Sequence, residues 1–195
     1  MKRLIVIILL IFVTACASFG TRASDDPLLL LQEASELYGT ERDPVRAEEL
    51  IHEAMALAVG ENNLAALAEA YRQYGLFFRS NAVGRFEAHY RKEGFLDEHT
   101  TFDKRYDRSL HYLRAAEVLF AKQQRFDSLS EVYLGLAKTY LLMADMPKAC
   151  EAFDQSILSN AAHRKALAAA AGTPLETPDP QEEYLKTMKQ QAGCP

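Results

Sequence analysis

Apolar residues recur at intervals of three and four along most of the chain. This pattern runs from 27 to 124 and again from 126 to 171, and no stretch shows sustained alternation of apolar and polar positions. Alanine- and leucine-rich runs at 65–68 and 165–171 add strong helix propensity. Because such intervals place side chains on one face of an α-helix, the sequence predicts an all-α domain.

Aspartate and proline residues mark the ends of this helical region. Asp25-Asp26-Pro27 is a helix-start signal, since aspartate caps a first turn and proline fits an early helical position. The prolines between 172 and 180 end the last long helix and predict an extended link. Residues 181–191 are amphipathic, and we expect them to form a helix that caps the apolar end of the domain.

Two spacings of aromatic and small residues each occur twice. A tyrosine precedes an alanine by nine residues at Tyr38–Ala47 and at Tyr140–Ala149, and an alanine precedes a tyrosine by 17 at Ala54–Tyr71 and at Ala116–Tyr133. Three segments also place a small, a large and a small residue at spacings of four and three. They are Ala47, Ile51 and Ala54, then Ser109, Leu113 and Ala116, then Ala149, Phe153 and Ser156.

This pattern resembles the tetratricopeptide repeat (TPR), in which a helix with large and aromatic residues pairs with a helix that carries small-large-small positions. The resemblance covers 27–161 and implies a right-handed superhelix of about three antiparallel helix pairs. The period is 40 residues, where the family has ~34, and only the second pair keeps the family's glycine, as Gly75. Residues 162–195 would hold the end of the last repeat helix, the proline-rich link and the capping helix. A generic helical bundle is the alternative.

In this family an inner groove is lined by the first helix of each pair, on the side turned away from the small residues. The matching positions in this chain are Gln32, Glu36, Glu69, Arg72, Leu76, Arg79, Leu134, Lys138 and Leu141. Their mixture of apolar and charged side chains suits an extended or helical peptide. The chain lacks the complete set of two lysines and two asparagines with which the family binds C-terminal carboxylates, so a chaperone-tail receptor is not expected.

The second helix pair contains an insertion of 22 residues at about 79–102, because 31 residues separate Phe78 from Ser109 where the other pairs have nine. The insertion is rich in aromatic and charged residues. Insertions between repeat helices often carry binding residues. Two interpretations are open, a ligand pocket or a flap whose aromatic rings pack over the core. Residues 100–103 are expected to cap a long helix that ends near Gln123.

The first 16 residues differ from the rest of the chain. A basic start, Met1-Lys2-Arg3, precedes an apolar run at 4–13. This run is too short to cross a ~30 Å hydrocarbon core as a helix, but it fits the central region of a secretory signal. Residues 13–16, Val-Thr-Ala-Cys, resemble the lipobox of bacterial lipoproteins, whose cysteine becomes the acylated first residue of the mature protein.

The lipobox resemblance implies a signal peptide at 1–15, cleavage between Ala15 and Cys16, lipidation of Cys16, and a lipidated tether at 16–26. Several acyl chains attach a protein to a membrane almost permanently. Because no aspartate directly follows the cysteine, the sorting rule of this class implies the outer membrane of a two-membrane bacterium, facing the periplasm. An ordinary cleaved signal is the alternative.

The chain has 22 basic and 27 acidic residues and a net charge of −5. Removal of 1–15 takes away two basic residues and no acidic one, which leaves 20 basic against 27 acidic residues and a net charge of −7. Binding to a nucleic-acid duplex needs a basic surface. A nucleic acid is therefore not an expected partner.

Cys150 and Cys194 are the cysteines that remain besides Cys16. An exported chain folds in an oxidising compartment, so the pair suggests a disulfide. The helix after Cys150 would be ~33 Å long, and an extended link of up to ~30 Å with a helix of ~17–20 Å can return over that distance. The bridge is feasible, and a buried Cys150 with a loose tail is the alternative.

The sequence contains no motif for metal binding or catalysis. Its histidines are scattered, and it has no Cys-x-x-Cys spacing, nucleophile elbow or phosphate-binding glycine loop. The acidic pair Glu48-Glu49 is interpreted as an exposed helix face, and Asp97-Glu98-His99 with Asp103 as a solvated approach to a helix. Neither an enzyme nor a cofactor or metal site is expected.

Together these features predict a lipid-anchored adaptor that docks a protein partner in its groove and helps to assemble a cell-envelope complex. The alternative function is a periplasmic receptor that binds a small envelope ligand, such as a glycan or peptide fragment, through the aromatic insertion.

Overall fold

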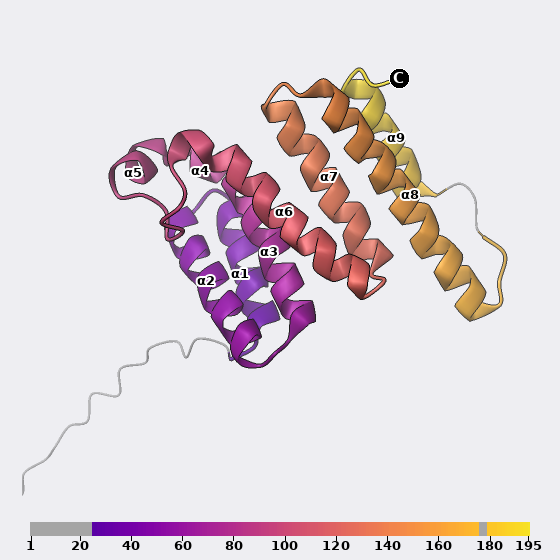
Figure 1. Cartoon of the computed structure of the whole chain (residues 1–195), viewed down its shortest axis with the longest axis horizontal. Helices are drawn as coiled ribbons and strands as arrows, with labels where there is room; N and C mark the ends of the chain where they lie inside the picture. The colour runs from indigo at the N-terminus through magenta and orange to yellow at the C-terminus, as the bar shows by residue number, and fades with distance from the viewer. Residues whose placement is uncertain (1–24, 176–178) are drawn as a thin grey trace, which may run out of the picture.

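The computed structural model describes residues 25–175 and 179–195, and all regular structure within these ranges is helical (Figure 1). The all-α prediction is confirmed. The α-helices are α1 (Pro27–Gly39), α2 (Pro44–Gly60), α3 (Leu64–Phe78), α4 (Asn81–Arg85), α5 (Glu87–Lys92), α6 (Arg105–Lys122), α7 (Phe126–Leu142), α8 (Met146–Ala171) and α9 (Pro180–Gln191), with a 3-10 turn η1 at Phe102–Lys104. None of these helices is both long and apolar enough to cross a bilayer.

Aspartate side chains and prolines begin several of these helices. Asp26 accepts a hydrogen bond from the amide of Leu28 at 2.9 Å, and Pro27 follows as the first residue of α1. Asp43 and Asp179 cap α2 and α9, each directly before a proline. The carboxylates satisfy first-turn amides that have no partner within the helix. The helix start at Asp26-Pro27 is confirmed.

The long helices pack as three successive pairs, α1 with α2, α3 with α6, and α7 with α8 (Figure 1). The first helices of neighbouring pairs also touch, α1 with α3 and α3 with α7, while α9 packs against α8. The nine residues in the small-large-small positions of α2, α6 and α8 are all fully buried. The spacing therefore identified the residues that face the partner helix within each pair.

Gly75 permits the close approach of α3 and α6. A Cβ atom at this position would lie 2.7 Å from Cγ of Leu113 and 3.0 Å from the carbonyl oxygen of Ser109. Ser109 donates a hydrogen bond of 2.7 Å from its hydroxyl to the carbonyl of Gly75. Any larger residue at position 75 must therefore separate the two helices or shift Leu113.

We expect Gly75→Ala to lower the free energy of unfolding by about 2 kcal/mol, because the added methyl overpacks a buried contact. The higher helix propensity of alanine stabilises the helix by less than this. Gly39→Ala is the matched control. No atom lies within 4 Å of a Cβ there, so this change should leave stability equal or slightly higher. Urea unfolding of the two variants measures the difference, and equal stabilities would contradict it.

The insertion folds over the first half of the core. Tyr90, Phe95 and Phe102 are buried in one cluster with aromatic residues of α3 and α6. The rings of Tyr90 and Phe95 stack with centroids 4.3 Å apart, and Phe78 of α3 meets Phe95 edge-on at 5.1 Å. These rings pack over the core, as expected of a flap, and are not exposed to solvent.

Two expectations for this region are wrong. Residues 100–103 do not cap α6 with a side chain, because Asp103 instead pairs with Arg91 at 2.7 Å and η1 precedes the helix. Asp97 is not solvated, since it is 7% exposed and forms an ion pair with Arg108. The predicted end of α6 near Gln123 agrees with the structure.

Candidate functional site

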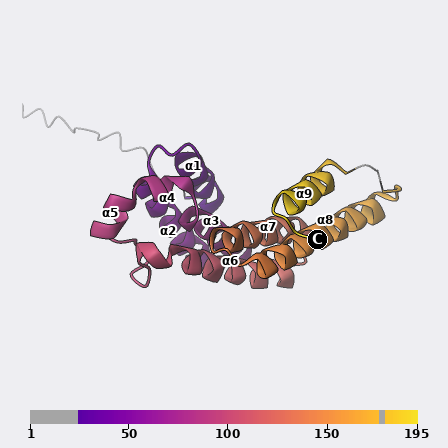
Figure 2. The ribbon, with the colours of Figure 1, turned by 90° about the horizontal axis from the view of Figure 1, so that it is seen from above.

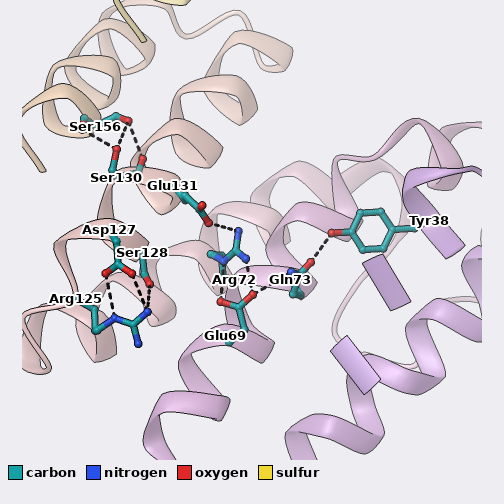
Figure 3. Close-up of polar contacts among 10 residues, drawn as sticks. All are labelled: Tyr38, Glu69, Arg72, Gln73, Arg125, Asp127, Ser128, Ser130, Glu131 and Ser156. Atoms are coloured by element: carbon teal, nitrogen blue, oxygen red, sulfur yellow. Dashed lines mark hydrogen bonds and ion pairs between the residues drawn. The ribbon is translucent and has the colours of Figure 1, made fainter. Parts of the chain in front are cut away.

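A row of hydrogen-bonded polar side chains connects the first helices of the three pairs (Figure 3). In this row Tyr38 of α1 donates from its hydroxyl to Oε1 of Gln73 at 2.5 Å, and Nε2 of Gln73 donates to Oε1 of Glu69 at 3.0 Å. Arg72 of α3 donates from Nε to Glu69 at 2.9 Å and pairs with Glu131 of α7 at 2.8 Å. These contacts fix the positions of α1, α3 and α7 relative to one another.

A hollow of about 420 Å³ lies between α1, α3 and α7, with α9 at its edge. Five of the nine predicted groove residues line it: Arg72, Leu76, Arg79, Leu134 and Lys138. Figure 2 shows α1 and α9 on the same side of the molecule, and both contribute residues to this hollow.

A second hollow, of about 590 Å³, lies between α1, α3 and the start of α7, and Gln32 and Glu69 line it. Both hollows include Ser35 and Gln73, so they form one continuous surface that we call the groove. The structure thus brings together seven of the nine predicted residues.

Glu36 and Leu141, the other two predicted positions, line neither hollow. Glu36 is exposed and accepts a hydrogen bond from Gln32 at 3.3 Å. Leu141 is partly buried against the core between α7 and α8. The family pattern therefore overestimates the groove at these two positions.

The groove also contains residues that the tetratricopeptide resemblance did not predict. Gln73 follows Glu69 by four residues and so shares its helix face, which is a signal that could have identified it. Arg125, in the turn before α7, binds Asp127 at 2.8 Å and Ser128 at 3.2 Å (Figure 3). It also lines the second hollow. Gln181 reaches the first hollow from α9, and no local pattern could predict this.

Two groove arginines, Arg72 in α3 and Arg79 directly after it, have different electrostatic surroundings. Burial acts to lower the pKa of Arg72, but the hydrogen bond and charge of Glu69 and the charge of Glu131 outweigh it, so the pKa is raised. Burial lowers the pKa of Arg79, and the interaction with Tyr38 offsets this only in part. Burial raises the pKa of Tyr38 to about 12, so this phenol stays protonated and remains a donor.

A second polar network joins the insertion to α2 and α3. Glu48 is 2% exposed and accepts hydrogen bonds from the Tyr74 hydroxyl at 2.6 Å and from the Leu96 amide at 3.0 Å. Nε2 of His52 lies 2.9 Å from the same hydroxyl. The interpretation of Glu48 as part of an exposed helix face is wrong. Burial raises the pKa of Glu48 to about 7, while the two hydrogen bonds lower it in part.

Cys150 and Cys194, the two cysteines expected to pair, form a disulfide with Cα atoms 5.4 Å apart. The bridge fixes the chain after α9 to α8. Leu185 of α9 is fully buried, and Lys189 binds Asp154 of α8 at 2.8 Å. These contacts keep α9, and with it Gln181, at the edge of the groove.

The described ranges contain no group of three or more metal-ligating side chains. The predicted cleavage and lipidation residues, Ala15 and Cys16, lie outside the residues that the structure describes. Comparison of the chain with known protein families, with curated proteins and with solved structures found no match.

Proposed function

We propose that this chain is a TPR-like docking protein, without enzymatic activity, whose groove holds a segment of a protein partner. The observation that carries the proposal is the groove itself, since the first helices of three successive helix pairs line one continuous surface with apolar and charged side chains. The polar row from Tyr38 to Glu131 supports it, because a fixed groove loses little entropy when a partner docks.

Lipidation at Cys16 would hold this groove at a membrane. The basic start, the apolar run and the Val-Thr-Ala-Cys segment support a lipoprotein of the outer membrane that faces the periplasm and helps to assemble a cell-envelope complex. The receptor alternative has less support, because the aromatic rings of the insertion are buried in the core.

Photocrosslinking tests the docking role. A photoreactive residue at Leu76 or at Leu134, both in the groove, should crosslink the native full-length protein to a discrete partner in cells. The matched control is the same residue at Leu158 of α8, whose side chain is 61% exposed and lies outside the groove. Equal crosslinking at Leu158, or none at the groove positions, would count against the proposal.

The anchor is tested separately. Cys16→Ser should abolish incorporation of labelled palmitate and move the protein from the membrane fraction to the soluble fraction, because the thioether that carries the diacylglycerol cannot form. Ser18→Ala serves as the control, since it changes a neighbouring residue and keeps the cysteine. Unchanged labelling of the Cys16→Ser variant would rule out the lipid at this position.

A further inference from the structure

Arg79 and Lys138 are cations of the groove that no carboxylate of the described residues pairs with. Arg79 follows the last residue of α3, and its Nε is shielded from solvent without a hydrogen-bond partner. Lys138 of α7 donates a hydrogen bond to the Tyr184 hydroxyl at 3.5 Å. Both side chains line the hollow of about 420 Å³.

Glu131, the acidic residue that lines the same hollow, does not neutralise these two cations. Glu131 is paired with Arg72, which Glu69 also binds, so this arginine has two carboxylates. The hollow therefore carries an excess of positive charge in a chain whose net charge is −5. Burying part of a cation without a carboxylate partner opposes folding, and such groups concentrate at binding sites.

Apolar side chains lie beside the two cations. Leu76 of α3 and Leu134 of α7 line the hollow with them. A ligand that fits this surface has a carboxylate next to an apolar group. A guanidinium binds a carboxylate with two parallel hydrogen bonds, and an ammonium adds a point charge.

We infer that this hollow binds an acidic segment of the docked protein, in which an aspartate or glutamate contacts Arg79 and Lys138 and a neighbouring apolar residue packs on Leu76 and Leu134. This inference rests on the proposed docking function and names the chemistry of the partner. Other anions are outcomes of the test.

Fluorescence anisotropy with two peptides tests the inference on the intact protein. One probe is a short fluorescein-labelled peptide of alternating leucine and glutamate, and the other replaces each glutamate by glutamine. The glutamate peptide should bind at least about tenfold more tightly, since a charge-assisted hydrogen bond contributes ~1.5–3 kcal/mol. Its affinity should fall as salt rises.

Three variants localise the effect. Arg79→Met and Lys138→Met should each weaken the glutamate peptide about tenfold and leave the glutamine peptide unchanged. Lys165→Met removes the same charge at an exposed position of α8 and should change neither affinity. Arg79→Met should not lower the melting temperature, because it removes an unpaired cation that is costly to bury; this keeps the binding result interpretable.

The outcomes separate this inference from the docking role. Equal affinity of the two peptides would overturn the acidic preference and leave docking intact, and so would full displacement of the glutamate peptide by an equal concentration of inorganic phosphate. Failure of both peptides would overturn the inference, and the crosslinks from Leu76 and Leu134 would then decide the docking role independently.

Discussion

Reduction of the Cys150–Cys194 disulfide is expected to lower the free energy of unfolding by about 4 kcal/mol and to release α9 before the rest of the fold. The bridge closes a loop between cysteines 44 residues apart, and a loop of this length gains much entropy when it opens in the unfolded chain. Without the bridge, α9 keeps mainly the burial of Leu185 and its surface ion pairs with α8.

Urea unfolding with and without dithiothreitol measures the overall loss, and hydrogen exchange of residues 180–191 shows whether α9 opens first. The Cys150→Ser/Cys194→Ser variant should match the reduced protein, and dithiothreitol should not change it further. Gln181 of α9 lines the groove, so release of α9 should also disturb the groove. Reduction should therefore weaken crosslinking from a photoreactive residue placed at Lys138, which contacts Tyr184 of α9. Unchanged protection of α9 after reduction would contradict this role of the disulfide.

The sequence predicts the packing within each helix pair because that packing is periodic. Ala47, Ser109 and Ala149 recur at equivalent positions, and each is fully buried. The same periodicity placed most of the groove residues on the first helices. It cannot show which residues of a helix face line a hollow, and it included Glu36 and Leu141, which line neither.

Contacts between distant segments could not be predicted in the same way. Glu48 sits next to the exposed Glu49 in an amphipathic helix, and its burial depends on the insertion that brings Leu96 over it. Asp97 is also buried because the insertion folds over the core, where this residue forms an ion pair with Arg108 of α6. The edge of the groove at Gln181 depends on how α9 packs against α8, which no pattern in the sequence specifies.

The burial of Glu48 also predicts how stability changes with pH. Its pKa is raised from the ordinary 4.5 to about 7, so the folded protein binds a proton that the unfolded chain releases between these values. Stability should therefore fall as pH rises from 4.5 to 7, and the cost is fully present above pH 7. At ~1.4 kcal/mol for one unit of pKa difference, this cost is roughly 3 kcal/mol.

Glu48→Gln should remove this dependence, because the amide oxygen can still accept from the Tyr74 hydroxyl and the Leu96 amide, while the side chain cannot ionise. Its stability relative to wild type should rise between pH 4.5 and 7, as followed by urea unfolding. Glu49→Gln changes the exposed neighbour, which pairs with Arg46. The stability of this variant should change with pH in parallel with that of wild type. Burial lowers the pKa of His52 and gives an opposite slope, which is shared by all three proteins and so cancels in the comparison. Parallel curves for wild type and Glu48→Gln would show that the carboxyl is ionised at little cost, and that the insertion is held over α2 by its aromatic rings rather than by a protonated acid.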